Sequence, residues 1–280
     1  MQRAIFVDVD GTLTSHTGEI PESARVAVRE ARANGHLVFL ATGRSPASLW
    51  DELRDIGFDG AITGAGAHVE VGGVVLADSA MTPDQVTHVS QFFDEHGVAY
   101  ILESVDGLMS STAMADRIRR VLVEALGPEG PPEEPGSRRF LRGIHLDVDP
   151  LSMPVHKVGI FDSPIDLDAI RAGVGEDYLV IPATVTALGE NAGELSPRGV
   201  HKAKGIEAVC AHLDIDPADT VAFGDGMNDL EMLAYAGVGV AMGGAPQAVI
   251  DAADTLTAAP HEHGLAEAFA RLGLIGDLAA

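Results

Sequence analysis

Cysteine is almost absent from this sequence, since Cys210 is the only one among 280 residues. A single cysteine cannot form an intrachain disulfide or build a zinc site rich in cysteine ligands. No apolar run approaches the roughly 18 residues that a membrane helix requires. The N-terminal apolar stretch meets Asp8 too early to be the core of a signal peptide. We therefore expect a cytoplasmic protein that does not enter a membrane.

Basic residues are also scarce. Lysine and arginine total 18, against 42 aspartates and glutamates, and the formal net charge is -24 at pH 7. Such a surface repels nucleic acids and anionic membranes, so we expect neither as a partner. If the substrate is an anion, the local potential at the site must be reversed, and a divalent cation is the simplest means.

Both ends of the chain alternate short apolar runs with amphipathic stretches, a pattern typical of βα units. With about 150 residues per domain, the length indicates about two domains. The sequence predicts an α/β fold with a doubly wound, mostly parallel sheet. The expected strands are 4–9, 36–41, 220–223 and 238–242, and the expected helices are 21–33, 229–236 and one that begins at Ser45-Pro46, with a hairpin at 69–76.

The pattern changes between these two α/β blocks. Expected helices at 84–95 and 115–126 are interleaved with expected strands at 98–102, 154–161 and 178–181. We therefore expect an inserted α+β cap domain over residues 82–185, with residues 1–81 and 186–280 forming the α/β core. Several prolines in 127–137 cannot sustain a helix and predict a mobile loop.

Polar residues gather where the predicted strands end, which is where open α/β sheets bind their ligands. Asp8 and Asp10 project to the same side of an extended segment, where two carboxylates repel each other unless a cation lies between them or one is protonated. Each segment, taken alone, also has an ordinary explanation as a turn, a helix cap or a surface lysine. Lys204, two residues after Lys202, is a second candidate for the functional lysine. In chain order the segments are Asp8-Val9-Asp10-Gly11-Thr12, Thr42-Gly43-Arg44, Lys202 and Gly224-Asp225-Gly226-Met227-Asn228-Asp229.

Taken together, these four segments resemble the motifs of the haloacid dehalogenase (HAD) superfamily, in particular the Cof-type branch (HAD-IIB). That branch carries a large α/β cap between the second and third motifs. The segments 41–44 and 237–242 match the branch pattern as well, and the spacing to Asp225 favours Lys202 over Lys204 as the family lysine. The resemblance implies a HAD-like Rossmannoid core and a Mg²⁺-dependent phosphatase that acts through an aspartyl phosphate.

The resemblance also implies the role of each carboxylate. Asp8 would attack phosphorus, and Asp10 would protonate the leaving group and then accept a proton from water. Mg²⁺ would be held by Asp8, by the backbone carbonyl of Asp10 and by Asp225. Asp229 would support the ion directly or indirectly, since magnesium prefers oxygen ligands.

The remaining motif residues would bind the phosphate group of a small phosphorylated metabolite, such as a sugar phosphate. Thr42, Lys202 and Asn228 would contact or orient it, and Gly43 would let the backbone approach it closely. Two alternatives stay open at this point: a sugar phosphomutase of the same superfamily and a non-catalytic sugar-phosphate sensor. The substrate, the degree of promiscuity and the oligomeric state are also open.

Three other features carry weaker expectations. Many relatives have Asn-Gly-Ala after the third strand, where this chain has Gly64-Ala65-Gly66-Ala67 and lacks a polar side chain at the edge of the site. His261-Glu262-His263 lacks the spacing of a zinc motif, and we expect a solvated turn. Cap arginines could bind a second anionic group or lie on a solvated face balanced by glutamates: Arg117, Arg119, Arg120, Arg138, Arg139 and Arg142.

Overall fold

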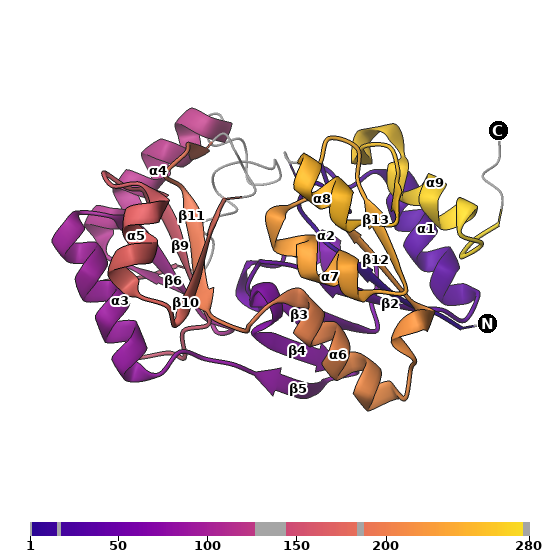
Figure 1. Cartoon of the computed structure of the whole chain (residues 1–280), viewed down its shortest axis with the longest axis horizontal. Coiled ribbons are helices and arrows are strands. Elements are labelled where there is room, and N and C mark those ends of the chain that lie inside the picture. The colour runs from indigo at the N-terminus through magenta and orange to yellow at the C-terminus, as the bar shows by residue number, and fades with distance from the viewer. Residues whose placement is uncertain (1, 16–17, 127–143, 184–187, 277–280) are drawn as a thin grey trace. The chain divides into compact units, whose positions relative to one another are not determined.

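Two β-sheets organise the chain in the computed structural model, which describes residues 2–15, 18–126, 144–183 and 188–276 (Figure 1). The loop expected at 127–137 lies outside the described residues. Each sheet belongs to a compact unit of its own. The first unit comprises Met1–Gly43, Leu49–Asp78 and His201–Ala280, and the second comprises Arg44–Ser48 and Ser79–Val200.

The first unit contains an eight-stranded sheet whose first six strands run parallel and whose last two form an antiparallel hairpin at one edge. This arrangement confirms the predicted doubly wound, mostly parallel sheet. In spatial order the strands are β14 (Thr255–Leu256), β13 (Val238–Ala241), β12 (Thr220–Gly224), β1 (Ala4–Val7), β2 (Leu37–Ala41), β3 (Gly60–Thr63), β4 (His68–Val71) and β5 (Val74–Asp78).

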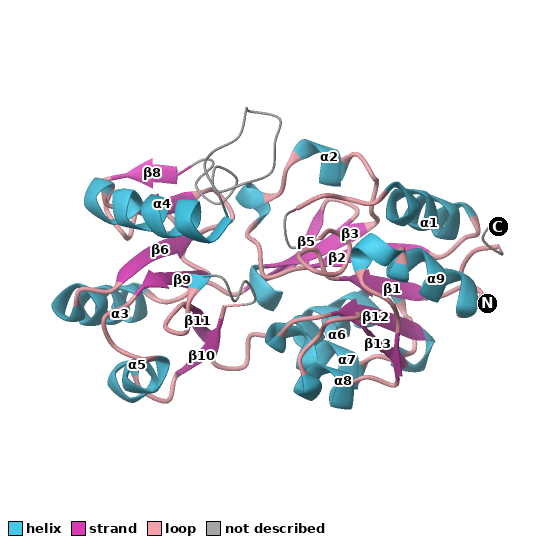
Figure 2. Cartoon of the chain, turned by 90° about the horizontal axis from the view of Figure 1, so that it is seen from above, coloured by secondary structure: helices cyan, strands magenta, loops and turns pink. Residues whose placement is uncertain are grey.

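Helices cover both faces of this sheet (Figure 2). One face carries α1 (Glu22–Ala33), α2 (Asp51–Arg54) and α9 (Gly264–Arg271), and the other carries α6 (Lys202–Leu213), α7 (Leu230–Tyr235) and α8 (Gln247–Ala252). Alternate side chains of β1 enter the two cores, Ile5 and Val7 on one side and Ala4 and Phe6 on the other. Because both faces are buried, the central strands are continuously apolar, which made them recognisable in the sequence.

The second unit is built on a six-stranded mixed sheet with helices on both faces. Helices α3 (Pro83–His96) and α5 (Leu167–Val174) pack on one face, and α4 (Thr112–Leu126) packs on the other. In spatial order the strands are β10 (Tyr178–Pro182), β11 (Gly193–Pro197), β9 (Lys157–Asp162), β6 (Ala99–Glu103), β7 (Leu108–Ser110) and β8 (Ile144–Leu146).

The junctions between the units differ from the expected ones. The second junction falls after Val200, whereas the sequence indicated residue 185. The reason is β11, which pairs with both β9 and β10 and so completes the second sheet. The helix expected to begin at Ser45-Pro46 is only a 3₁₀ turn, Pro46–Ser48, followed by the short α2.

Within the ranges that the structure describes, no helix is both long enough and apolar enough to cross a membrane.

Candidate active site

Neighbouring strands of the first sheet bring the predicted residues to one edge. Strands β12, β1 and β2 are adjacent and parallel, so their carboxyl ends meet at that edge. Asp225 follows β12, Asp8 follows β1 and Thr42 follows β2. All three side chains are buried. The strand order therefore joins motifs that are far apart in the sequence.

Lys202 lies at the centre of this group. Its side chain is fully buried, and Nζ donates hydrogen bonds of 2.6 Å to Asp8 Oδ1 and of 2.6 Å to Asp229 Oδ1. Burial by itself lowers the pKa of the ammonium group, but the carboxylates of Asp229 and Asp8 outweigh it and raise the pKa above its usual value. The two carboxylates explain why a lysine is tolerated at the first position of α6, against the helix dipole.

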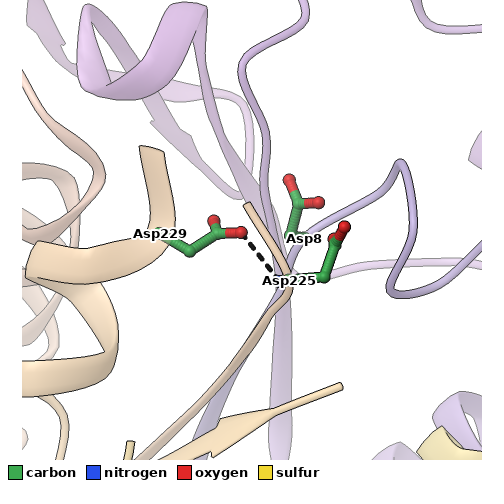
Figure 3. Close-up of side chains that lie close together, drawn as sticks. All are labelled: Asp8, Asp225 and Asp229. Carbon is green, nitrogen blue, oxygen red and sulfur yellow. Dashed lines mark hydrogen bonds between the residues drawn. The ribbon is translucent and has the colours of Figure 1, made fainter. Parts of the chain in front are cut away.

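Asp229 holds the turn after β12 in place. Its Oδ2 accepts a 3.0 Å hydrogen bond from the backbone N–H of Asp225 (Figure 3). The same oxygen accepts a 2.8 Å hydrogen bond from the backbone N–H of Gly226. A Cβ atom at position 224 would lie 2.5 Å from Asp229 Cγ, so only glycine there lets the carboxylate fold back against the strand end. With the bond from Lys202, the carboxylate accepts three hydrogen bonds.

Asp225 and Asp8 both lie where a negative charge is poorly solvated. Burial is the main cause that raises the pKa of Asp225 to about 7, and the Asp229 carboxylate adds to it. Thr12 opposes this effect, because its hydroxyl donates a 2.9 Å hydrogen bond to Asp225 Oδ1. Burial also raises the pKa of Asp8 well above its usual value, although Lys202 partly offsets it. The ionised forms of Asp8 and Asp225 are therefore disfavoured, even with Lys202 nearby.

These carboxylates fit a divalent cation. Each of Asp8, Asp225 and Asp229 offers an oxygen atom, and the three atoms lie within 4.8 Å of one another (Figure 3). A set of buried oxygen donors is what Mg²⁺ prefers. A cation would also offset the burial and the repulsion between carboxylates that raise the pKa values of Asp8 and Asp225.

The other predicted residues take up places around this cluster. Asp10 is half-buried, and its charge contributes to the raised pKa values of Asp8 and Asp225. Gly43 is half-buried directly after Thr42, and Asn228 is half-buried in the 3₁₀ turn Met227–Asp229.

The alternative lysine does not reach the site. Lys204 is exposed and pairs with Glu207 at 2.6 Å on the surface of α6. The structure thus brings Lys202 to the carboxylates, as the motif spacing predicted.

Thr12 is the contact that sequence reasoning missed. It stood within the first motif, but no role was predicted for it. Its hydroxyl is fully buried against a residue 213 positions further along the chain. The signal available in the sequence was a hydroxyl residue directly after the Asp-x-Asp-Gly turn.

The weaker expectations resolve as follows. Arg117 pairs with Asp162 at 2.7 Å and Arg119 pairs with Asp116 at 2.8 Å, both within the second unit. Arg119 is exposed, as expected for a solvated face, but Arg117 is half-buried, and the balancing acids are aspartates and not the expected glutamates. Arg120 bonds through Nε to the backbone carbonyl of Asp116. The other three cap arginines lie outside the described residues: Arg138, Arg139 and Arg142.

The histidines near the C-terminus lie in an exposed turn, as expected. The 3₁₀ turn Pro260–Glu262 presents His261 to solvent, and exposed His263 bonds to Ser23 at 2.9 Å.

Comparison with known proteins gives the family. The family model for haloacid dehalogenase-like hydrolases matches residues 5–269. YkrA of Bacillus subtilis is 30% identical over 275 residues, which is 98% of each chain. A phosphoglycolate phosphatase of Methanopyrus kandleri is 28% identical over 266 residues, covering 95% of each chain. The solved structure of a sugar phosphatase of HAD subclass IIB superimposes with a TM-score of 0.80 and 28% identity, over 98% of this chain and 100% of that one. The chain therefore belongs to the haloacid dehalogenase-like hydrolases, and the expected fold and enzyme class, a phosphatase, are both confirmed.

Proposed function

We propose that this protein is a Mg²⁺-dependent phosphatase that hydrolyses a small phosphomonoester through a phosphoryl group carried transiently by Asp8. The observation that carries the proposal is the buried cluster of Asp8, Lys202, Asp225 and Asp229 at one edge of the first sheet. The cluster brings together a carboxylate nucleophile, the hydrogen-bonded ammonium group of Lys202 and several carboxylate oxygens that can bind a metal ion.

The first chemical step transfers the phosphoryl group to the protein. A carboxylate oxygen of Asp8 forms a bond to phosphorus while the bond from phosphorus to the ester oxygen breaks. Asp10 donates a proton to the departing oxygen, so the product leaves as an alcohol. Asp8 must be ionised for this step, and Lys202 favours that form by hydrogen bonding to Oδ1.

The second step returns the site to its starting state. Asp10 removes a proton from a water molecule, which attacks phosphorus and breaks its bond to Asp8, and inorganic phosphate is released. Negative charge on the phosphoryl oxygens must be stabilised in both steps. Two of the three N–H donors of Lys202 bond to Asp8 and Asp229, and we assign the third to a phosphoryl oxygen, beside the Thr42 hydroxyl.

Mg²⁺, when bound, would offset the charge on the phosphoryl oxygens and would be held by the carboxylates of Asp8 and Asp225, with the backbone carbonyl of Asp10. We assign Asp229 a positioning role. Its carboxylate accepts three hydrogen bonds, which fix Lys202 and the turn that carries Asp225. Asn228, in that same turn, would orient the phosphate group.

The substrate class is supported by the relatives. They include a sugar phosphatase, a phosphoglycolate phosphatase and, at 26% identity, the Bacillus subtilis 5-amino-6-(5-phospho-D-ribitylamino)uracil phosphatase YitU. Each of these names describes a phosphatase that acts on a small phosphorylated metabolite. The single cysteine and the net charge of -24 support a cytoplasmic setting without nucleic acid or membrane partners.

The proposal is tested by measuring phosphate release from a panel of small phosphomonoesters with and without Mg²⁺. We expect release that stops on chelation, returns when Mg²⁺ is restored, and needs no bisphosphate activator, in contrast to a phosphomutase. The near-isosteric Asp8→Asn is the matched control, and it should lower kcat by roughly 10³-fold or more because it removes the nucleophile. Full activity in Asp8→Asn would refute the role of Asp8, and no release from any ester would favour a sensor.

A further inference from the structure

We propose that the turn Gly64–Gly66, which follows β3, is a positioning element that fixes Thr42 and Lys202 relative to each other. The inference rests on the phosphate-binding roles proposed above for these two residues. It goes beyond them by assigning a function to a segment that has no polar side chain.

The backbone of this turn is unusual. Three successive residues have positive φ: Gly64 at 56°, Ala65 at 56° and Gly66 at 107°. Glycine adopts such angles readily, but alanine rarely does, because its Cβ is crowded against the backbone. Ala65 is also buried. A strained residue of this kind persists where its surroundings hold it firmly, and such residues gather at functional sites.

One side of the turn holds Thr42. The backbone N–H of Ala65 donates a 3.0 Å hydrogen bond to the carbonyl oxygen of Thr42. The N–H of Thr42 in turn donates a 2.8 Å hydrogen bond to the carbonyl oxygen of Ile62 in β3. Both backbone polar groups of Thr42 are therefore tied to β3 and the turn that follows it.

The other side of the turn touches the start of α6. A Cβ atom on Gly66 would lie 2.3 Å from the carbonyl oxygen of His201 and 3.1 Å from the backbone nitrogen of Lys202. One helical turn further, a Cβ atom on Gly205 would lie 2.5 Å from Ile62 Cγ2. The two glycines let α6 rest directly on β3 and on the turn.

The close packing of α6 against β3 and the turn fixes the position of the Lys202 backbone, from which its ammonium group reaches the carboxylates. Its two 2.6 Å hydrogen bonds, to Asp8 and Asp229, leave little tolerance for a shift of the helix. A displacement of about 1 Å at a catalytic group can cost about 100-fold in rate. The turn thus acts on phosphate through Lys202 and Thr42 and does not itself touch the reacting atoms.

The first test compares Gly66→Ala with Gly35→Ala. Gly66 has a φ of 107° and Gly35 a φ of 88°, so a side chain is strained at both positions, but a Cβ atom on Gly35, which precedes β2, would meet nothing within 4 Å. The pair therefore separates displacement of α6 from backbone strain. We expect kcat to fall about 10- to 100-fold in Gly66→Ala and to stay near the wild-type value in Gly35→Ala. Wild-type kcat in a folded Gly66→Ala protein would overturn the proposal.

The second test asks whether Gly66 acts through Lys202. The dissociation constant of inorganic phosphate is measured by calorimetry in the presence of Mg²⁺, for Gly66→Ala in the wild-type and in the Lys202→Met background. We expect weaker binding in the first background and a clearly smaller further weakening in the second, because only Thr42 is then left for the turn to position. Equal weakening in both backgrounds would show that Gly66 acts independently of Lys202 and would overturn the proposal.

A third pair keeps the proposal testable if Gly66→Ala does not fold. Gly205→Ala suits a helical backbone, and the three atoms that its methyl group would approach most closely all belong to the side chain of Ile62. We expect Gly205→Ala to lower kcat and phosphate affinity, and Ile62→Ala in the same chain to restore both by removing the clashing atoms. Wild-type values in Gly205→Ala, or no recovery in the double variant, would overturn the proposal. If the wild type releases no phosphate, the proposed function fails, and the phosphate-binding comparisons alone decide the role of the turn.

Discussion

Replacing Lys202 with methionine removes the single positive charge between two buried carboxylates while keeping much of the side-chain volume. Lys202 and Asp229 are 0% exposed and Asp8 is 5% exposed, so water cannot take over the role of the ammonium. Removing one partner of a buried ion pair typically lowers the free energy of unfolding by about 3–5 kcal/mol, because the remaining charge is left uncompensated. We expect a loss of this size in Lys202→Met.

The loss converts into a shift of the unfolding temperature. In domains of 150–250 residues, each kcal/mol corresponds to about 2–4 °C, so the expected fall in Tm is about 6–20 °C. Lys204→Met is the matched control, because it makes the same substitution two residues away in the exposed pair with Glu207. Such a surface pair contributes about 0–1 kcal/mol, so the control should unfold within a few degrees of the wild type.

The difference between wild type and Lys202→Met should also depend on pH. Burial raises the pKa of Asp8 and Lys202 opposes it, so removing Lys202 raises that pKa further. A carboxyl group whose pKa is higher in the folded than in the unfolded state costs stability as pH rises from the unfolded to the folded pKa. Below that range the group is protonated and the cost disappears. The Tm difference should therefore be larger at pH 8 than at pH 5.

Thermal unfolding followed by circular dichroism, with a chelator present, measures both effects. If Lys202→Met and Lys204→Met unfolded within about 2 °C of each other at pH 8, the buried ion pairs would contribute no more than a surface pair, and the electrostatic reasoning would be refuted.

Three further predictions follow from the same contacts. Burial raises the pKa of Asp225 to about 7, so protons compete with Mg²⁺ for this carboxylate. The increase in Tm on adding Mg²⁺ should therefore be larger at pH 8 than at pH 6. Equal increases at both pH values in a thermal-shift assay would contradict ion binding at Asp225. Thr12→Val removes a hydrogen bond that lowers the Asp225 pKa, so the pH midpoint of this Mg²⁺ effect should rise, and an unchanged midpoint would contradict the contact. In the second unit, buried Lys157 lies 3.3 Å from both Glu103 and Glu194, so Lys157→Met should cost about 3–5 kcal/mol in chemical denaturation; a loss below about 1 kcal/mol would show that the pairs are unimportant.

The central strands were predictable because burial on both faces requires short, continuous apolar runs. The residues that lie at the candidate site were predictable because they are polar and directly follow those runs. Strands β1, β2, β12 and β13 appear as short apolar runs, each within two residues of its observed limits. Their parallel order places Asp8 and Asp225 together, as the motifs required.

Other features left weaker marks. Strand β8 is largely exposed, and β11 contains Glu194 and Pro197, so neither strand forms an apolar run. Because β11 was not predicted, the end of the second unit was placed at residue 185 and not after residue 200. The Thr12–Asp225 hydrogen bond and the contact of Gly66 with His201 join residues that are far apart in sequence, and local patterns carry no information on such pairs.

The phosphoryl group on Asp8 is tested most directly by rapid acid quench of the protein with a substrate that carries radioactive phosphorus, in the presence of Mg²⁺. We expect label on the peptide that contains Asp8 within the first turnover, and none in Asp8→Asn. Phosphate release with no labelled protein at any quench time, or equal labelling of Asp8→Asn, would contradict a covalent route through this residue.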